Sequence, residues 1–192
     1  MEKLRLFWAI TFPAVIREAL AEIQAVFRQL KLDVKWVDPE NFHLTLRFLG
    51  SVDASVVDPL ATAVSKQVAA TPAFKLALGG VGVFPSVRKP RVLWVGLSGH
   101  EPVAVLHRQV EAAVVSLGFP REEKAFSPHV TIGRLRTPTN AAALERTIAQ
   151  MDARHVGEIT VTGLDLVASR LTPDGPVYTA LRRITFSGGD SG

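Results

Sequence analysis

Two kinds of apolar periodicity alternate along this chain of 192 residues. After Pro13, apolar side chains recur every three or four positions, which predicts a helix with one buried stripe. Segments in which apolar residues alternate with polar ones, or form short runs, predict strands. The predicted helices cover residues 13–30, 53–70, 101–117 and 140–151. The predicted strands cover residues 4–11, 34–37, 41–49, 74–83, 91–97, 129–135 and 158–170, the last as one or two strands.

Turn and capping residues separate these elements. Gly50 is expected to end the strand before it, and Thr139 or Asn140 to cap the helix that follows. The run Pro173-Asp174-Gly175-Pro176 predicts a turn between two strands. We therefore expect an antiparallel hairpin made of residues 164–171 and 177–186.

The order of elements indicates the fold class. Strands alternate with helices but hairpins also occur, which favours an α+β fold with antiparallel sheets over a doubly wound parallel sheet. No linker rich in Pro, Gly or Ser divides the chain. Residues 1–186 are therefore predicted to form a single domain of two interleaved lobes, and residues 187–192 a disordered tail.

Two short segments repeat one pattern, Phe42-His43-Leu44-Thr45-Leu46 and Pro128-His129-Val130-Thr131-Ile132. Side chains two positions apart in a strand share a face, so each histidine projects together with its threonine. At neutral pH one imidazole can accept a proton while another donates one, and hydroxyls can hydrogen-bond phosphate oxygens. The repeat predicts one site for acid–base chemistry on a phosphate.

A phosphate anion also needs a cation. Arg134 is the nearest candidate, while Arg47 and Arg5 are less direct ones. In a regular strand Arg134 would point away from His129, because the two residues are an odd number of positions apart. A bulge or bend at Gly133 would bring both side chains to the same face.

Composition narrows the setting of this chemistry. The net charge of +4 favours an anionic partner, although it is far from the dense basic stripe of a protein that holds nucleic acid by charge alone. The absence of cysteine rules out thiolate metal sites and disulfides and fits a reducing compartment. No apolar run approaches the roughly 18 residues that cross a bilayer, and the N-terminus does not read as a signal peptide. We expect a cytoplasmic protein with no membrane partner.

Other chemistries fit less well. The histidines lack the His-Glu-x-x-His spacing of a zinc site, and neither segment supplies the carboxylates of a dinuclear phosphatase. The glycine-rich run at residues 79–82 is not followed by Gly-Lys-Ser/Thr, so it is not a P-loop. Residues 96–100 lack the final glycine of a serine nucleophile elbow.

At the two His-x-Thr segments the sequence resembles the 2H phosphoesterase superfamily, and within it the bacterial and archaeal RNA 2′,3′-cyclic phosphodiesterases. The similarity extends over residues 5–9, 36–50, 84–85, 90–94 and 126–134. It implies a bilobed α+β fold with pseudo-two-fold symmetry. One motif from each lobe would line a central cleft, with helices packed outside.

The same resemblance implies an activity and roles for individual residues. A terminal 2′,3′-cyclic phosphate of RNA would be hydrolysed to a 2′-phosphate with no metal and no nucleotide cofactor. His43 would be the acid that protonates the leaving 3′ oxygen, and His129 the base that activates water. Thr45 and Thr131 would bind phosphate oxygens, with Arg134 near the phosphate or base. Relatives of this kind can also join tRNA halves through a 2′,5′ linkage, so reverse ligation is a second expected activity.

Aromatic and basic residues outside the motifs are candidates for holding the RNA. Phe7 and Phe126 are candidate platforms on which a terminal base stacks. Trp36 and Trp94 are predicted to be packing residues. A loop with three basic residues is a candidate contact for the RNA backbone, through Arg88, Lys89 and Arg91.

Two alternatives stay open. One is a sibling phosphoesterase that acts on 2′,5′-linked oligonucleotides or on a small cyclic-phosphate metabolite. The other is a non-catalytic module that only holds RNA ends. The second fits less well, since arginine serves simple phosphate capture better than two near-neutral imidazoles. A monomer is the default expectation.

Overall fold

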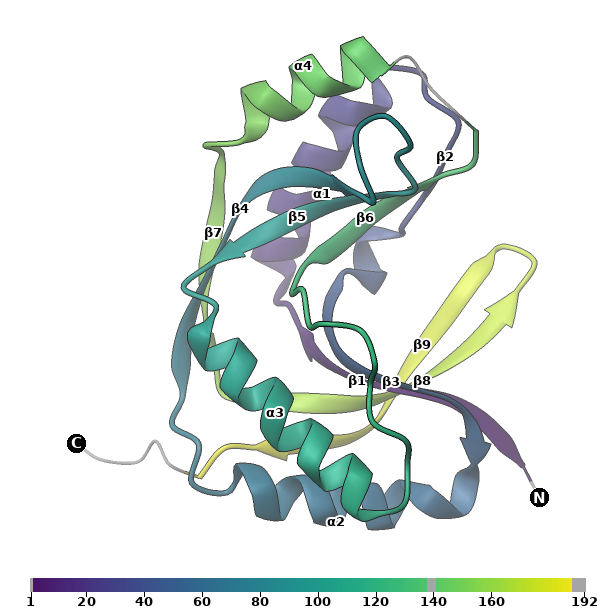
Figure 1. The fold of residues 1–192 in the computed structure, drawn as a ribbon, viewed down its shortest axis with the longest axis vertical. Helices are drawn as coiled ribbons and strands as arrows, with labels where there is room; N and C mark the ends of the chain where they lie inside the picture. Colours follow the sequence, from purple (N-terminus) through teal and green to yellow (C-terminus); the bar gives the residue numbers. More distant parts are fainter. Residues whose placement is uncertain (1, 138–140, 188–192) are drawn as a thin grey trace.

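The computed structural model describes residues 2–137 and 141–187 of the chain (Figure 1). Its strands are β1 (Lys3–Thr11), β2 (Val34–Trp36), β3 (His43–Asp53), β4 (Phe74–Phe84), β5 (Val92–Ser98), β6 (Val130–Leu135), β7 (His155–Val161), β8 (Gly163–Thr172) and β9 (Gly175–Thr185). Its α-helices are α1 (Ala14–Arg28), α2 (Val57–Val68), α3 (Glu101–Ser116) and α4 (Ala141–Met151). Short 3₁₀ turns at Pro39–Asn41 and Ala54–Val56 precede β3 and α2.

The strands form one curled antiparallel sheet in the order β7-β4-β5-β6-β3-β1-β8-β9, with β2 paired to β6. The two motif strands, β3 and β6, meet at its centre through Leu44 and Val130. Along this order four strands lie on each side of the junction, and β2 adds a fifth on the side of β6. We call β3, β1, β8 and β9 the His43 half, and β6, β5, β4 and β7 the His129 half. The predicted α+β class with antiparallel pairing is confirmed, and the halves share a single sheet.

The helices pack against both halves (Figure 1). α2 and α3 contact each other and the His43 half, through β9 and β3 respectively. α1 and α4 contact the His129 half instead. Because α1 follows β1 directly in the chain, the N-terminal segment supplies a strand to one half and a helix to the other. No helix within the described residues is long and apolar enough to span a membrane.

The main apolar core lies between the helices and one face of the sheet. Its largest fully buried side chains include Trp8, Phe27 and Phe42. Leu44 and Val130, at the central junction, are also 0% exposed. Fully burying one such aliphatic side chain contributes about 1.5–3 kcal/mol. The core therefore holds the two motif strands by their apolar residues, which leaves the alternate residues on the other face.

The strand that starts at His43 does not end at Gly50, contrary to expectation. Gly50 adopts a φ of 73°, which glycine tolerates because it has no Cβ. It pairs with Leu6, next to a register shift in which Leu49 is the extra residue. The chain therefore bends within the sheet at this bulge and stays paired as far as Asp53.

The C-terminal hairpin follows the prediction. Thr172 pairs with Gly175 across a turn of Pro173 and Asp174, and the antiparallel ladder continues to Gly163 and Thr185. Both residues considered as the cap of α4, at positions 139 and 140, lie outside the described residues. So do residues 188–192 of the predicted tail. The one described tail residue, Ser187, donates a hydrogen bond to the Ala69 carbonyl.

Strand β2 covers Gly133 of β6. A Cβ at Gly133 would lie 2.7 Å from Val34 Cγ1 and 3.1 Å from the ring of Trp36. The guanidinium of Arg28 lies over the Trp36 ring, 4.9 Å from the ring centre. Trp36 is thus a packing residue, as predicted, and the glycine makes room for it.

Replacing Gly133 by valine should destabilise the protein by about 1–3 kcal/mol, because the added atoms overlap a stiff β-branched neighbour. Urea unfolding measures this free energy. The control Thr160→Val changes an exposed residue of β7 and should shift stability by less than about 0.5 kcal/mol. Equal stabilities of the two variants would contradict the packing assigned to Gly133.

Candidate active site

The two histidines come together because they precede the one residue pair that joins β3 to β6. Leu44 pairs with Val130, and in an antiparallel register the flanking residues place His43 opposite Thr131 and Thr45 opposite His129. Leu44 and Val130 face the core, so these four polar side chains share the opposite face. The expected meeting of the two motifs is thus what the strand pairing produces.

Each imidazole is held by the same backbone contact. His43 Nδ1 lies 2.6 Å from the Asn41 carbonyl oxygen, and His129 Nδ1 lies 2.7 Å from the Ser127 carbonyl oxygen. A carbonyl only accepts, so Nδ1–H is the donor in both. This leaves Nε2 of each ring for proton transfer. His43 Nε2 lies 3.0 Å from Thr45 Oγ1.

Aromatic rings flank each imidazole. Phe7 and Tyr178 lie 4.9 and 5.3 Å from the His43 ring centre. Phe84 lies 5.0 Å from the His129 ring centre, and Trp94 6.5 Å. Trp94 thus borders the site besides packing. Neither Tyr178, the only tyrosine of the chain, nor Phe84 lies in a pattern that predicts a role at the site. Tyr178 reaches His43 through the pairing of β9, β8 and β1, and no local pattern signals that contact.

Both imidazoles favour the neutral form. Burial lowers the pKa of His43; the Asn41 carbonyl opposes this, and the charges of Arg134 and His129 lower the pKa further. Burial also lowers the pKa of His129, against the effect of the Ser127 carbonyl and together with Arg134. One cation therefore acts on both rings. An anion bound beside them would act in the opposite direction and favour their protonation.

A bulge turns Arg134 toward the histidines. In the pairing of β5 with β6, Trp94 is opposite Thr131 and Leu93 is opposite Gly133, so Ile132 is an extra residue. Because of this extra residue, the alternation of side chains between the two sheet faces is shifted by one position after Ile132. Arg134 therefore lies on the same face as Thr131. The predicted bulge is confirmed. Arg134 is exposed, and no ion pair or side-chain hydrogen bond in the described part of the chain involves it.

The same bulge occurs in the first motif and has the opposite effect on an arginine. Ala9 pairs with Thr45 and Trp8 with Arg47, so Leu46 is the extra residue. Arg47 therefore points to the helix side of the sheet, where its Nε lies 2.6 Å from Glu111 Oε2. The expectation that Arg47 is a phosphate cation is wrong. On β3 it is Phe48 that lies two residues after the extra residue, and it occupies the place on the histidine face that Arg134 occupies on β6.

The remaining candidates outside the motifs differ in accessibility. Phe7 is 3% exposed, and Phe126 stacks on His107 with ring centres 4.0 Å apart, so both rings are largely committed to internal contacts. Phe48 is 57% exposed and lies 5.7 Å from Phe7, which makes it an open aromatic surface beside the histidines. Arg5 is exposed on the same strand face as Phe7.

Carboxylates do not gather at this site. Within residues 2–137 and 141–187, no group of three or more His, Cys, Asp and Glu side chains is placed to hold a metal ion. The polar groups supplied by the two motifs are imidazoles and hydroxyls, with one guanidinium. They suit proton transfer and binding of an anion.

A family model described as LigT like Phosphoesterase matches the chain twice, over residues 10–94 and 95–178. The chain belongs to this family. Each match contains one His-x-Thr motif. The resemblance to 2H phosphoesterases and the predicted phosphodiesterase class are thereby confirmed.

Relatives of the LigT-like family cover nearly the whole chain. An RNA 2′,3′-cyclic phosphodiesterase of Methanothermobacter thermautotrophicus is 34% identical over 177 residues, which is 92% of this chain and 96% of the relative. A protein of the same name from Thermotoga maritima is 32% identical and covers 97% of both chains.

Solved structures show the same fold. TT0787 of Thermus thermophilus superposes with a TM-score of 0.81 at 30% identity, over 96% of this chain and 99% of that chain. E. coli LigT complexed with 3′-AMP superposes with a TM-score of 0.75 at 27% identity, over 97% and 99%. The predicted α+β fold of the 2H phosphoesterases, with antiparallel strands, is confirmed.

The lowered pKa values make anion binding by this LigT-like site pH-dependent. Sulfate, which does not titrate near neutrality, should bind more tightly as pH falls from 8 to 6. Calorimetry in buffers of different ionisation enthalpy should show proton uptake on binding, and NMR should show the pKa of both histidines rising. Sulfate affinity that does not change with pH would contradict the electrostatics described for His43 and His129.

Proposed function

We propose that the protein hydrolyses the 2′,3′-cyclic phosphate at RNA ends to a 2′-phosphate, without a metal or nucleotide cofactor. The observation that carries this proposal is the matched pair of histidines. Both imidazoles have Nδ1 bound to a backbone carbonyl and lie on one sheet face with Arg134, which has no ion pair within residues 2–137 and 141–187. Two rings held alike, near a cation, suit displacement at phosphorus.

The two rings would divide the proton transfers between them. His129 Nε2 accepts a proton from water as the water oxygen attacks phosphorus. The bond from phosphorus to the 3′ oxygen breaks, and protonated His43 donates its proton to that oxygen. The products are a 2′-phosphomonoester and a 3′-hydroxyl. The same displacement with a 5′-hydroxyl in place of water, and the 3′ oxygen again leaving, would join tRNA halves through a 2′,5′ linkage.

The negative charge of the substrate favours the protonation states that this mechanism needs. Free imidazoles at this site favour the neutral form, and the negative phosphate favours protonation of one of them. Thr45, Thr131 and Arg134 would bind the non-bridging oxygens, where negative charge is spread in the transition state. The rate should follow a bell-shaped pH profile. Its two apparent pKa values should describe the coupled histidine pair and not either histidine alone.

Neighbouring residues offer contacts for the rest of an RNA end. The loop with Arg88, Lys89 and Arg91 follows directly after Phe84, which borders His129, and its basic side chains are exposed. The names of the relatives and the 3′-AMP complex of E. coli LigT support a nucleotide or RNA ligand. We propose a monomeric cytoplasmic enzyme acting on such ends.

Alanine in place of His43 or His129 should lower the turnover of 2′,3′-cyclic AMP and of a cyclic-phosphate oligonucleotide by about 10²–10⁴-fold, because each removes one proton transfer. The control His155→Ala, an exposed histidine of β7, should keep wild-type turnover. Wild-type turnover should persist in excess EDTA. Activity lost with the chelator would rule out the metal-free mechanism, and near-normal activity of both histidine variants would rule out the proton transfers.

Glutamine in place of Arg134 should reduce kcat/KM by about 10- to 100-fold, since a hydrogen bond to a charged group is worth about 1.5–3 kcal/mol. Steady-state kinetics on the same cyclic nucleotide measures the change. Arg146→Gln, on the exposed side of α4, is the matched control and should leave kcat/KM unchanged. Equal kinetics for the two variants would show that Arg134 does not bind the reacting phosphate.

A substrate panel separates the proposed reaction from the alternatives. A sibling enzyme would turn over 2′,5′-linked oligonucleotides or a small cyclic-phosphate metabolite faster than cyclic-phosphate RNA. A non-catalytic module would bind the RNA end and release it unchanged.

A further inference from the structure

The segment that delivers His129 has no regular structure of its own. Residues 117–129 lie between α3 and β6 outside any helix or strand. In the described part of the chain, no backbone group of residues 119–126 bonds to another backbone group. Side chains must therefore fix this segment, and with it the imidazole of His129.

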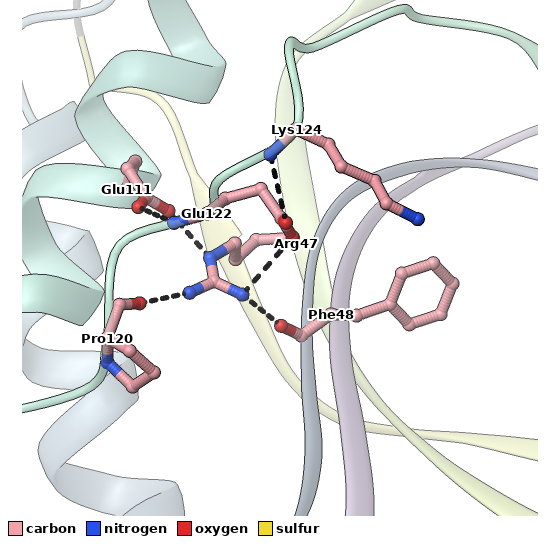
Figure 2. A network of polar contacts seen from close by, with 6 residues as sticks. All are labelled: Arg47, Phe48, Glu111, Pro120, Glu122 and Lys124. Atoms are coloured by element: carbon pink, nitrogen blue, oxygen red, sulfur yellow. Dashed lines mark hydrogen bonds and ion pairs between the residues drawn. The ribbon is translucent and has the colours of Figure 1, made fainter.

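The buried guanidinium of Arg47 provides the main fixed point (Figure 2). Arg47 is 8% exposed and donates through Nη2 to the Pro120 carbonyl at 2.5 Å and through Nε to Glu111 at 2.6 Å. Nη1 donates to the Phe48 carbonyl and lies 3.6 Å from Glu122 Oε2. Figure 2 shows the ring of Phe48 pointing away from this cluster. One side chain thus ties the His43 strand, α3 and the His129 segment together.

Glu111 extends the tie along the segment. Its Oε1 accepts the backbone N–H of Glu122 at 2.8 Å, while Oε2 accepts from Arg47. One helical turn earlier on α3, His107 stacks on Phe126 with ring planes 3° apart. The next residue, Ser127, supplies the carbonyl that holds His129 Nδ1. The segment is therefore fixed at both ends by one face of α3, which Arg47 joins to β3.

Arginine suits this position because its planar fork reaches several acceptors at once. The bulge at Leu46 makes the contact possible, since a regular strand would direct Arg47 to the same face as Thr45. The same distortion that removes Arg47 from the phosphate site therefore aims it at the segment that carries the second histidine.

We propose that Arg47, with Glu111, is a positioning residue that sets the placement of His129 relative to His43. The proposal rests on the function proposed above and assigns Arg47 no contact with substrate. A misplacement of about 1 Å in a reacting group can cost about 100-fold in rate. Loosening the segment should therefore lower kcat much more than it raises KM.

The variant that tests this is Arg47→Met/Glu111→Leu. It removes both charges together, because leaving one of them buried and unpaired would destabilise the fold, whereas apolar residues of similar size are often tolerated. The backbone groups set free belong to Phe48, Pro120 and Glu122, which are all exposed residues that water can reach. The control Arg108→Met breaks an exposed pair with Glu101 on the same helix. It should leave every readout unchanged.

In the double variant we expect kcat on 2′,3′-cyclic AMP to fall by about 10- to 100-fold, with KM within about threefold of wild type and cooperative unfolding retained. NMR titration should show the pKa of His129 rising toward its ordinary value as water reaches the ring, whereas the pKa of His43 should not rise, because a more readily charged His129 opposes its protonation. A single substitution, Arg47→Lys, keeps the charge but not the fork and should not restore full kcat.

Wild-type kcat and an unchanged His129 titration in the folded double variant would overturn the proposal, as would full activity of Arg47→Lys. A fall in kcat with no change at His129 would also contradict it, because the effect would then come from elsewhere. The titration does not depend on turnover. If the wild-type protein failed to hydrolyse the cyclic phosphate, the proposed function would fail while the placement of His129 by Arg47 could still be judged.

Discussion

The pairing of Leu44 with Val130 is the contact on which the site depends. It is the point where the two halves become one sheet, and each partner is the residue directly after a motif histidine. A shift of one position in this register would turn one histidine toward the core. The core opposes such a shift, since Leu44 and Val130 are fully buried beneath the helices. Packing on one face of the sheet thus determines the chemistry on the other.

Bulges after the threonines give the two halves different roles. Both strands insert an extra apolar residue at the fourth motif position, Leu46 and Ile132. In the His129 half the bulge brings Arg134 to the site face, where its charge acts on both imidazoles. In the His43 half it exposes Phe48 beside the site and buries Arg47 under α3. The two imidazoles are held alike, whereas the residues around them differ.

Local patterns were sufficient for much of the fold. The stripe of α1, the β8–β9 hairpin and the shared face of each histidine and threonine follow from periods of 3.6 and 2, which depend on neighbours in the chain. The bulge near Gly133 was also predictable. Arg134 is an odd number of positions after His129, so it can share the face of His129 only if the strand is bulged or bent between them. Gly50 was misjudged, since a glycine with positive φ can bend a strand as well as end it.

Contacts between distant segments were not readable in the same way. Arg47 remained a less direct candidate for the phosphate cation because no glycine signals the bulge at Leu46 that turns it to the helix side of the sheet. Phe126 was a candidate platform for a base, and the stacking of His107 on its ring comes from the packing of α3, which no local pattern signals. Tyr178 reaches His43 only after three strands have paired. Each of these depends on tertiary register, which one sequence does not display.

The position of the phosphate in the product tests the central claim most directly. An oligonucleotide ending in a 2′,3′-cyclic phosphate, incubated with the protein in ¹⁸O-labelled water, can be followed by phosphorus NMR and mass spectrometry. In-line attack by water, with a proton donated to the 3′ oxygen, predicts a 2′-phosphate carrying one labelled oxygen and a free 3′-hydroxyl. A 3′-phosphate, or an RNA end that is bound but never opened, would contradict the account.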